Sequence, residues 1–133
     1  MKKISLALSL VVITLLSTFT ASADSFDHKK GKKVLRHVVC FKFKEGTTDQ
    51  QIKGIVEEFK SLKTKISAIH KFEWGINNSK EGFDKGFTHC FTLTFKSAAD
   101  FEAYVPHKDH QAFASNVGEV VEDVFVVDYW TSE

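Results

Sequence analysis

Four of the six histidines in this 133-residue chain lie where an imidazole could carry out chemistry. Two interrupt runs of alternating apolar residues, His37 in the run 34–43 and His89 in the run 87–95. The other two, His107 and His110, follow the single proline, Pro106. Imidazole has the unperturbed pKa nearest to neutrality among the side chains. If these histidines cluster, they would suit proton transfer, metal binding or a polar ligand pocket.

Each histidine also has a structural interpretation. A lone histidine on an apolar strand face is commonly a core residue with a hydrogen-bond partner, so a core position and a pocket position fit His37 equally. We expect His89 to be structural, because it lies between phenylalanines. We expect His107 to cap the local chain. Pro106 interrupts the segment from His107 to His110 and no carboxylate triad accompanies it, so we expect no metal site.

Tyr104 and His110 form the pair best suited to acid–base chemistry. A neutral imidazole can take a proton from the carbon next to a carbonyl, and a phenol can hold or polarise the carbonyl oxygen. The alternative interpretation is that both are partly exposed residues at helix ends. Chemistry of this kind needs no cofactor, and we expect none.

Alternation of apolar residues predicts the strands that would position these side chains. The first strand places His37 on its more apolar face, and the third does the same for Phe87 and His89. The second strand is less regular than the others. The predicted strands are Val34–Phe43, about Lys71 to Gly75 or Asn77, Phe87–Phe95 and Val124–Trp130.

Helical spacing of apolar residues predicts the intervening helices. A capping box that begins at Thr48 opens a helix from about Asp49 to Lys65. A second helix begins after Ser97 and ends or kinks at Pro106, because proline lacks the backbone donor. A further short helix runs from about Asp109 to Val117.

The resulting order, β-α-β-β-α-β, is the split arrangement of ferredoxin-like α+β folds. In that topology the first and third strands are central neighbours and the helices cover one face of the sheet. His37 and His89 should then point toward the helices. The opposite face has no helix left to cover it, and we expect it to be the surface of a homodimer.

Cys40 and Cys90 are the only cysteines, and both should lie on the uncovered face. A disulfide between them is possible if their strands are neighbours. The alternative is two small buried hydrophobic residues, which free cysteines often resemble. Neither cysteine has the CxxC spacing of a redox motif or zinc knuckle.

Residues 1–23 have the pattern of a secretory signal peptide cleaved after Ala23, and 24–33 read as a polar linker. The apolar stretch of about 13 residues is shorter than the roughly 20 that span a bilayer as a helix, which argues against a membrane anchor. We therefore expect a secreted or periplasmic protein that is not bound to a membrane.

Without Lys2 and Lys3, 16 basic residues oppose 17 acidic ones, a net charge of −1. This balance argues against nucleic-acid binding.

Five motifs, in order and with fitting spacing, resemble the stress-responsive A/B barrel (Dabb) domain. The likeness spans about Val34 to Tyr129, and we place the domain at 34–131. The motifs are Leu35–Val39 with Phe41–Lys44, Phe72–Gly75, Gly86–His89, Pro106–His110 and Val127–Tyr129.

The resemblance implies a dimeric α/β barrel of two ferredoxin-like sheets, with a small pocket between sheet and helices in each protomer. A plant cyclase of this family folds a linear polyketide thioester by intramolecular aldol condensation. Its working residues correspond to His37, Tyr104 and His110 here. Phe59 stands where that cyclase has a pocket tyrosine, so the substrate is left open.

The leading hypothesis is a pocket for a small, largely apolar molecule, lined by His37, Phe59, Tyr104 and His110, with possible His/Tyr acid–base chemistry. The first alternative is a non-catalytic stress-response or structural homo-oligomer. The second is a monooxygenase-like relative, since such enzymes share the dimeric barrel. The sequence carries no particular mark of the second alternative.

Overall fold

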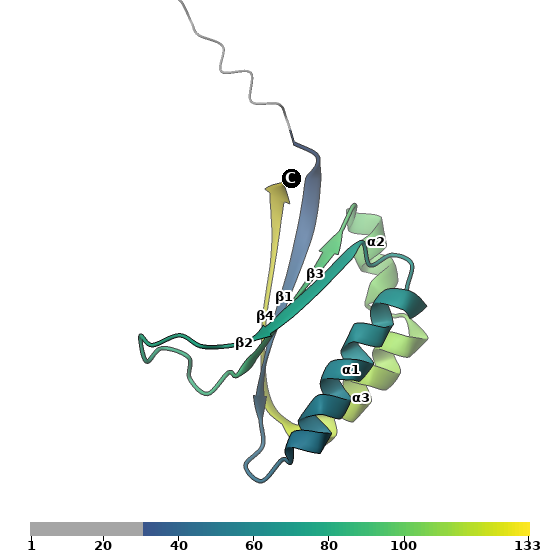
Figure 1. The fold of residues 1–133 in the computed structure, drawn as a ribbon. Helices are drawn as coiled ribbons and strands as arrows, with labels where there is room; N and C mark the ends of the chain where they lie inside the picture. Colours follow the sequence, from purple (N-terminus) through teal and green to yellow (C-terminus); the bar gives the residue numbers. More distant parts are fainter. Residues whose placement is uncertain (1–30) are drawn as a thin grey trace, which may run out of the picture.

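The computed structural model describes residues 31–133 (Figure 1). The expected signal peptide, 1–23, and most of the expected linker, 24–33, lie outside the described residues. Within residues 31–133, no helix has the length and apolar character needed to cross a bilayer. The elements, in chain order, are β1 (Lys33–Phe43), α1 (Asp49–Lys65), β2 (Lys71–Ile76), β3 (His89–Phe95), α2 (Ala98–Tyr104), α3 (Lys108–Val120) and β4 (Val121–Ser132).

The four strands form one antiparallel sheet in the order β2-β3-β1-β4. The helices pack against one face of this sheet and leave the other face bare (Figure 1). The strand order makes β1 and β3 central neighbours, as the ferredoxin-like topology requires. The predicted α+β ferredoxin-like fold is confirmed.

Local sequence accounts for α1. Thr48 and Gln51 form the predicted capping box, in which each side chain bonds the backbone N–H of the other. The helix then buries Ile55, Val56, Phe59 and Leu62 against the sheet. Burial of each such side chain contributes about 1.5–3 kcal/mol to the free energy of folding. Burial of this face therefore holds α1 on the sheet.

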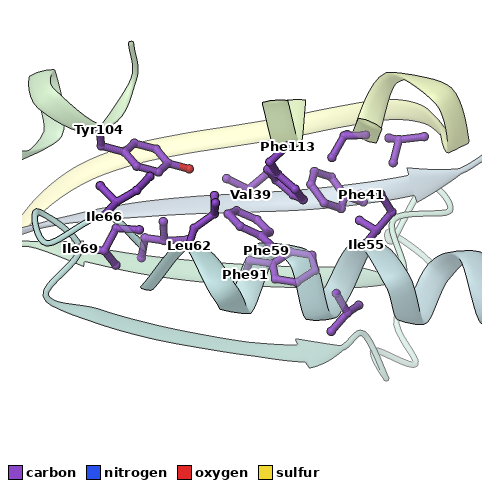
Figure 2. Close-up of a cluster of buried hydrophobic side chains, with 14 of the residues drawn as sticks. Val39, Phe41, Ile55, Phe59, Leu62, Ile66, Ile69, Phe91, Tyr104 and Phe113 are labelled. Carbon is purple, nitrogen blue, oxygen red and sulfur yellow. The ribbon is translucent and has the colours of Figure 1, made fainter. Parts of the chain in front are cut away.

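Aromatic rings fill the core between α1, α3 and the sheet (Figure 2). The Phe59 ring lies 4.4 Å from that of Phe113 and 4.7 Å from that of Phe91, measured between centroids. Phe41 joins the cluster from β1 at 5.9 Å from Phe59. Spacings of this size are those of favourable aromatic contacts.

Pro106 divides the second helical region into α2 and α3. Ser97 caps α2, which ends at Tyr104. α3 is longer than the predicted 109–117 because it continues through Gly118 to Val120. Glycine disfavours a helix, but Val117 is buried in the core and Val120 packs against it, which compensates locally for the low propensity.

Phe87 does not share the helix-side face of the third strand, so that prediction is wrong. β3 begins at His89, and Phe87 belongs to a turn in which its N–H donates to Asp84 O at 2.9 Å. Gly86 makes this turn possible with a positive φ of 83°. The Phe87 ring lies 6.1 Å from that of Phe125, on the bare face of the sheet.

β4 is an edge strand that exceeds the predicted 124–130 at both ends. It pairs with β1 from Lys33 opposite Ser132 to Phe43 opposite Val121. Long pairing with β1 extends the strand beyond its most apolar segment. Apolar side chains on both of its faces are exposed: Val124, Phe125, Val126, Val127, Tyr129 and Trp130.

Candidate functional site

A cavity of about 590 Å³ lies between α2, α3 and the half of the sheet formed by β1 and β4. Four of its lining residues are those expected from the sequence: His37, Phe59, Tyr104 and His110. The remaining walls are mainly apolar and include the exposed Val126 of β4. The structure thus brings all four side chains to one cavity.

The turn at Pro106 places Tyr104 and His110 in contact. Tyr104 is the last residue of α2 and His110 lies in the first turn of α3. Their ring centroids are 4.3 Å apart. An acid and a base carried by two short helices therefore meet at the cavity wall.

The Tyr104 hydroxyl is buried and has no hydrogen-bond partner among residues 31–133. In Figure 2 this hydroxyl points toward the side of the core where Val39 and Phe113 lie, and both residues line the cavity. Burial, and secondarily the charge of Asp128, raise the pKa of Tyr104 well above its ordinary value. The phenol is therefore protonated at neutral pH and can donate a hydrogen bond to a ligand.

His110 has a defined tautomer. Its Nδ1 lies 2.8 Å from the carbonyl oxygen of Val105, and because a carbonyl only accepts, Nδ1 carries the hydrogen. Burial is the largest cause that lowers the pKa of His110, and the bond to Val105 opposes this shift. The ring is therefore neutral at pH 7 and its Nε2 carries a lone pair that can take a proton.

His37 is paired with Asp128, a residue that the sequence reasoning did not assign to the site. The two residues face each other across β1 and β4, and Asp128 Oδ1 lies 2.6 Å from His37 Nδ1. The carboxylate accepts this bond from Nδ1, which leaves Nε2 as the ring nitrogen that is free of Asp128. The sequence did contain a signal that could have identified Asp128, because it is an acidic residue on the helix-side face of an otherwise apolar strand.

Aromatic contacts position His37 beside the other two polar residues. Its ring centroid lies 5.8 Å from that of Tyr104 and 5.3 Å from that of Phe101. Phe59, by contrast, is buried in the aromatic core and brings no polar atom to the cavity. The polar groups on the β1 and α2–α3 walls therefore come from His37, Tyr104 and His110.

The other two histidines have structural surroundings. His107 is the N-cap of α3, where its Nδ1 accepts from the backbone N–H of Asp109 at 3.3 Å. His89 is buried outside this cavity, with Nδ1 3.0 Å from the Thr88 hydroxyl and its ring stacked on Trp74. In the described part of the chain, no three His, Cys, Asp or Glu residues gather as a metal site would require.

Known proteins resemble this chain over most of the described residues. Residues 35–131 match the family described as the stress responsive A/B barrel domain. Stress-response A/B barrel domain-containing protein HS1 of Arabidopsis thaliana is 30% identical over 101 residues, 76% of this chain and 93% of that protein. Olivetolic acid cyclase of Cannabis sativa is 25% identical over 95 residues, 71% of this chain and 94% of the cyclase.

Solved structures agree with the fold. The hydroxynitrile lyase from Passiflora edulis superposes with a TM-score of 0.72 at 26% identity, covering 77% of this chain and 96% of the lyase. A protein from Bacteroides fragilis, described as dimeric and ferredoxin-like with unknown function, superposes with a TM-score of 0.58 at 25% identity, covering 72% and 94%. The fold, the ordered motifs and the match over residues 35–131 lead to one conclusion: this chain belongs to the stress responsive A/B barrel domain family.

Proposed function

We propose that this protein binds a small, largely apolar carbonyl compound in the cavity and moves a proton on it. The cavity volume, about 590 Å³, lies within the range of small-molecule sites. Mainly apolar walls with a few convergent polar groups are typical of such sites. The observation that carries the proposal is the contact between the rings of His110 and Tyr104, together with a buried Tyr104 hydroxyl that has no hydrogen-bond partner among residues 31–133.

The proposed chemistry assigns one role to each ring. Nε2 of His110 takes a proton from the carbon next to the carbonyl, because Nδ1 is occupied by its bond to Val105. The Tyr104 hydroxyl donates a hydrogen bond to the carbonyl oxygen and stabilises the negative charge that develops there. His37, held by Asp128, presents its Nε2 as a further hydrogen-bonding group for a polar atom of the ligand. No cofactor takes part in these steps.

Two relatives support a reactive pocket. One is named a cyclase and the other a hydroxynitrile lyase, at 25% and 26% identity. Both names denote enzymes. We expect this chain to differ from the cyclase at Phe59, where the cyclase has a pocket tyrosine. We therefore propose acid–base chemistry as the shared property and leave the substrate of this chain open.

The test follows exchange of α-protons for deuterium in an apolar ketone, phenylacetone, by NMR in D₂O. We expect the wild-type protein to accelerate exchange, and His110→Gln and Tyr104→Phe each to reduce the acceleration by about 10²–10⁴-fold. His70→Gln is the matched control, because His70 lies outside the cavity. If wild type neither binds nor exchanges ketones, the non-catalytic structural alternative is favoured.

We also propose that the protein is a homodimer that pairs through the bare sheet face. Phe125, Val127 and Tyr129 lie on that face with 52%, 38% and 46% of their surfaces exposed. Contiguous exposed apolar side chains of this kind mark a surface that binds another protein. The Bacteroides fragilis protein, which is described as dimeric, supports a dimer without indicating which face pairs. Native mass spectrometry should give a dimer for wild type and a monomer for Val127→Glu; a monomeric wild type contradicts the proposal.

Export is the remaining part of the proposal. It rests on the signal-peptide pattern of residues 1–23 in the sequence. N-terminal sequencing of protein purified from its own host should begin at Asp24. A mature chain that begins at Met1 would contradict export and would leave the proposed pocket chemistry unaffected.

A further inference from the structure

The segment that joins β2 to β3 projects from the bare face of the sheet. We call this segment, residues 77–88, the β2–β3 arm. In Figure 1 the arm leaves the end of the sheet and extends to the side opposite the helices. The bare face lies on that same side. A protein that covers the bare face therefore lies beside the arm.

An exposed aromatic side chain lies near the middle of the arm. Phe83 has 80% of its surface exposed, more than any other large hydrophobic residue in the range 31–133. The arm also continues the apolar surface of the bare face, because the Phe87 ring lies 6.1 Å from that of Phe125. Cys40 and Cys90 are register partners on this face, and both thiols are free. A partner that covers the bare face buries these side chains together.

Hydrogen bonds and turns hold the arm in one shape. Asn77 closes its base, since its N–H donates to Thr88 O at 2.7 Å and its side-chain amide donates to Phe87 O at 2.9 Å. Gly82 and Lys85, in the middle of the arm, have positive φ angles of 74° and 50°. Lys85 carries a side chain and so adopts this left-handed conformation at an energetic cost. A ring carried on a segment fixed in this way loses little conformational freedom when it binds.

The charged residues around Phe83 balance one another. Within the arm, Lys80 and Lys85 are matched by Glu81 and Asp84. A segment that inserts an aromatic ring into an anionic membrane combines it with an excess of cationic residues. An aromatic anchor with a polar surround of both signs is instead typical of a contact between proteins. The composition of the arm therefore favours a protein partner.

We propose that the β2–β3 arm clasps a second copy of this chain and packs Phe83 against the partner's bare face. This contact rests on the proposed homodimer and adds to it a contact outside the sheets themselves. The Bacteroides fragilis relative, described as dimeric, supports a second copy as the partner. A two-fold dimer repeats every contact, so each protomer contributes one arm and receives one. Partial burial of two Phe83 rings strengthens association by about 10–100-fold.

The first measurement is the dissociation constant of the dimer by analytical ultracentrifugation, with the full chain expressed in its own host. Phe83→Ser should raise this constant by about 10–100-fold. Phe83→Leu keeps an apolar side chain and Lys80→Ser changes a polar neighbour, so each should stay within about threefold of wild type. Circular dichroism checks that every variant folds, which we expect because the Phe83 side chain is largely exposed.

The second measurement locates the contact. The photoreactive variant Phe83→p-benzoylphenylalanine is prepared in ¹⁵N-labelled and unlabelled forms, which are mixed, irradiated and digested. We expect cross-linked peptides of mixed isotope that join the arm of one protomer to a strand of the other. Cross-links that stay within one chain, or that reach the partner's helices, would overturn the proposal.

The remaining outcomes separate the arm from the homodimer. A monomeric wild type contradicts both. If Val127→Glu dissociates the dimer and Phe83→Ser leaves it unchanged, the homodimer stands and the arm contact is refuted. Binding to phosphatidylglycerol vesicles that Phe83→Ser abolishes without a change in dimerisation would assign the arm to a membrane and would also overturn the proposal.

Discussion

Replacement of Tyr104 by phenylalanine tests whether the Tyr104 hydroxyl is present for function or for stability. The ring is 1% exposed, and its hydroxyl has no hydrogen-bond partner among residues 31–133. An unsatisfied buried polar group costs about 1–3 kcal/mol. Because this hydroxyl borders a cavity, we take the lower end of that range. Tyr104→Phe should therefore raise the free energy of unfolding by about 1 kcal/mol.

Urea unfolding at fixed protein concentration measures this gain as a higher midpoint with an unchanged slope. For a domain of about 100 residues, the same gain raises Tm by roughly 4 °C or more. The variant should at the same time lose α-proton exchange of phenylacetone. Higher stability together with lower activity is the signature of a group retained for function.

The matched control removes the ring as well as the hydroxyl. The Tyr104 ring centroid lies 5.1 Å from that of Phe95 and 4.3 Å from that of His110, so Tyr104→Ala loses packing on two sides. It should lower the free energy of unfolding by about 3–5 kcal/mol. If Tyr104→Phe itself lowers stability by about 1 kcal/mol or more, the hydroxyl makes a stabilising bond and the reasoning is refuted.

Three further predictions concern the neighbouring residues. Burial lowers the pKa of His110 below its ordinary 6.5, so the unfolded chain takes up the proton before the folded protein does as pH falls. The urea concentration at the unfolding midpoint should therefore decrease as pH is lowered from about 7.5 to about 5.5, and the decrease should be smaller in His110→Gln. Asp128→Ala should reduce the population of the His37 tautomer with hydrogen on Nδ1, measured by ¹⁵N chemical shifts; an unchanged ratio would mean that Asp128 does not orient the ring. Phe59→Ala should cost about 3–5 kcal/mol in calorimetry, and a smaller loss would show that the aromatic core collapses around the gap.

Local signals in the sequence were sufficient for most of the fold. The capping box at Thr48 and Gln51 marked the start of α1, because it depends on residues three apart in the chain. Pro106 marked the division between α2 and α3, because the missing backbone donor acts at one position. Alternation placed His37 toward the helices, where it contacts Tyr104. Alternation failed for Phe87, since the turn at Gly86 carries that ring to the bare face.

The sequence by itself determined which side chains share a face, because strand and helix periods are local properties of the backbone. Tertiary structure decided which of them meet. The pairing of β1 with β4 placed Asp128 opposite His37, residues far apart in the chain. The packing of α2 and α3 over the sheet brought Tyr104 and His110 to one cavity, and strand register set Cys40 opposite Cys90. Register and helix placement depend on burial summed over the whole core, which no local pattern contains.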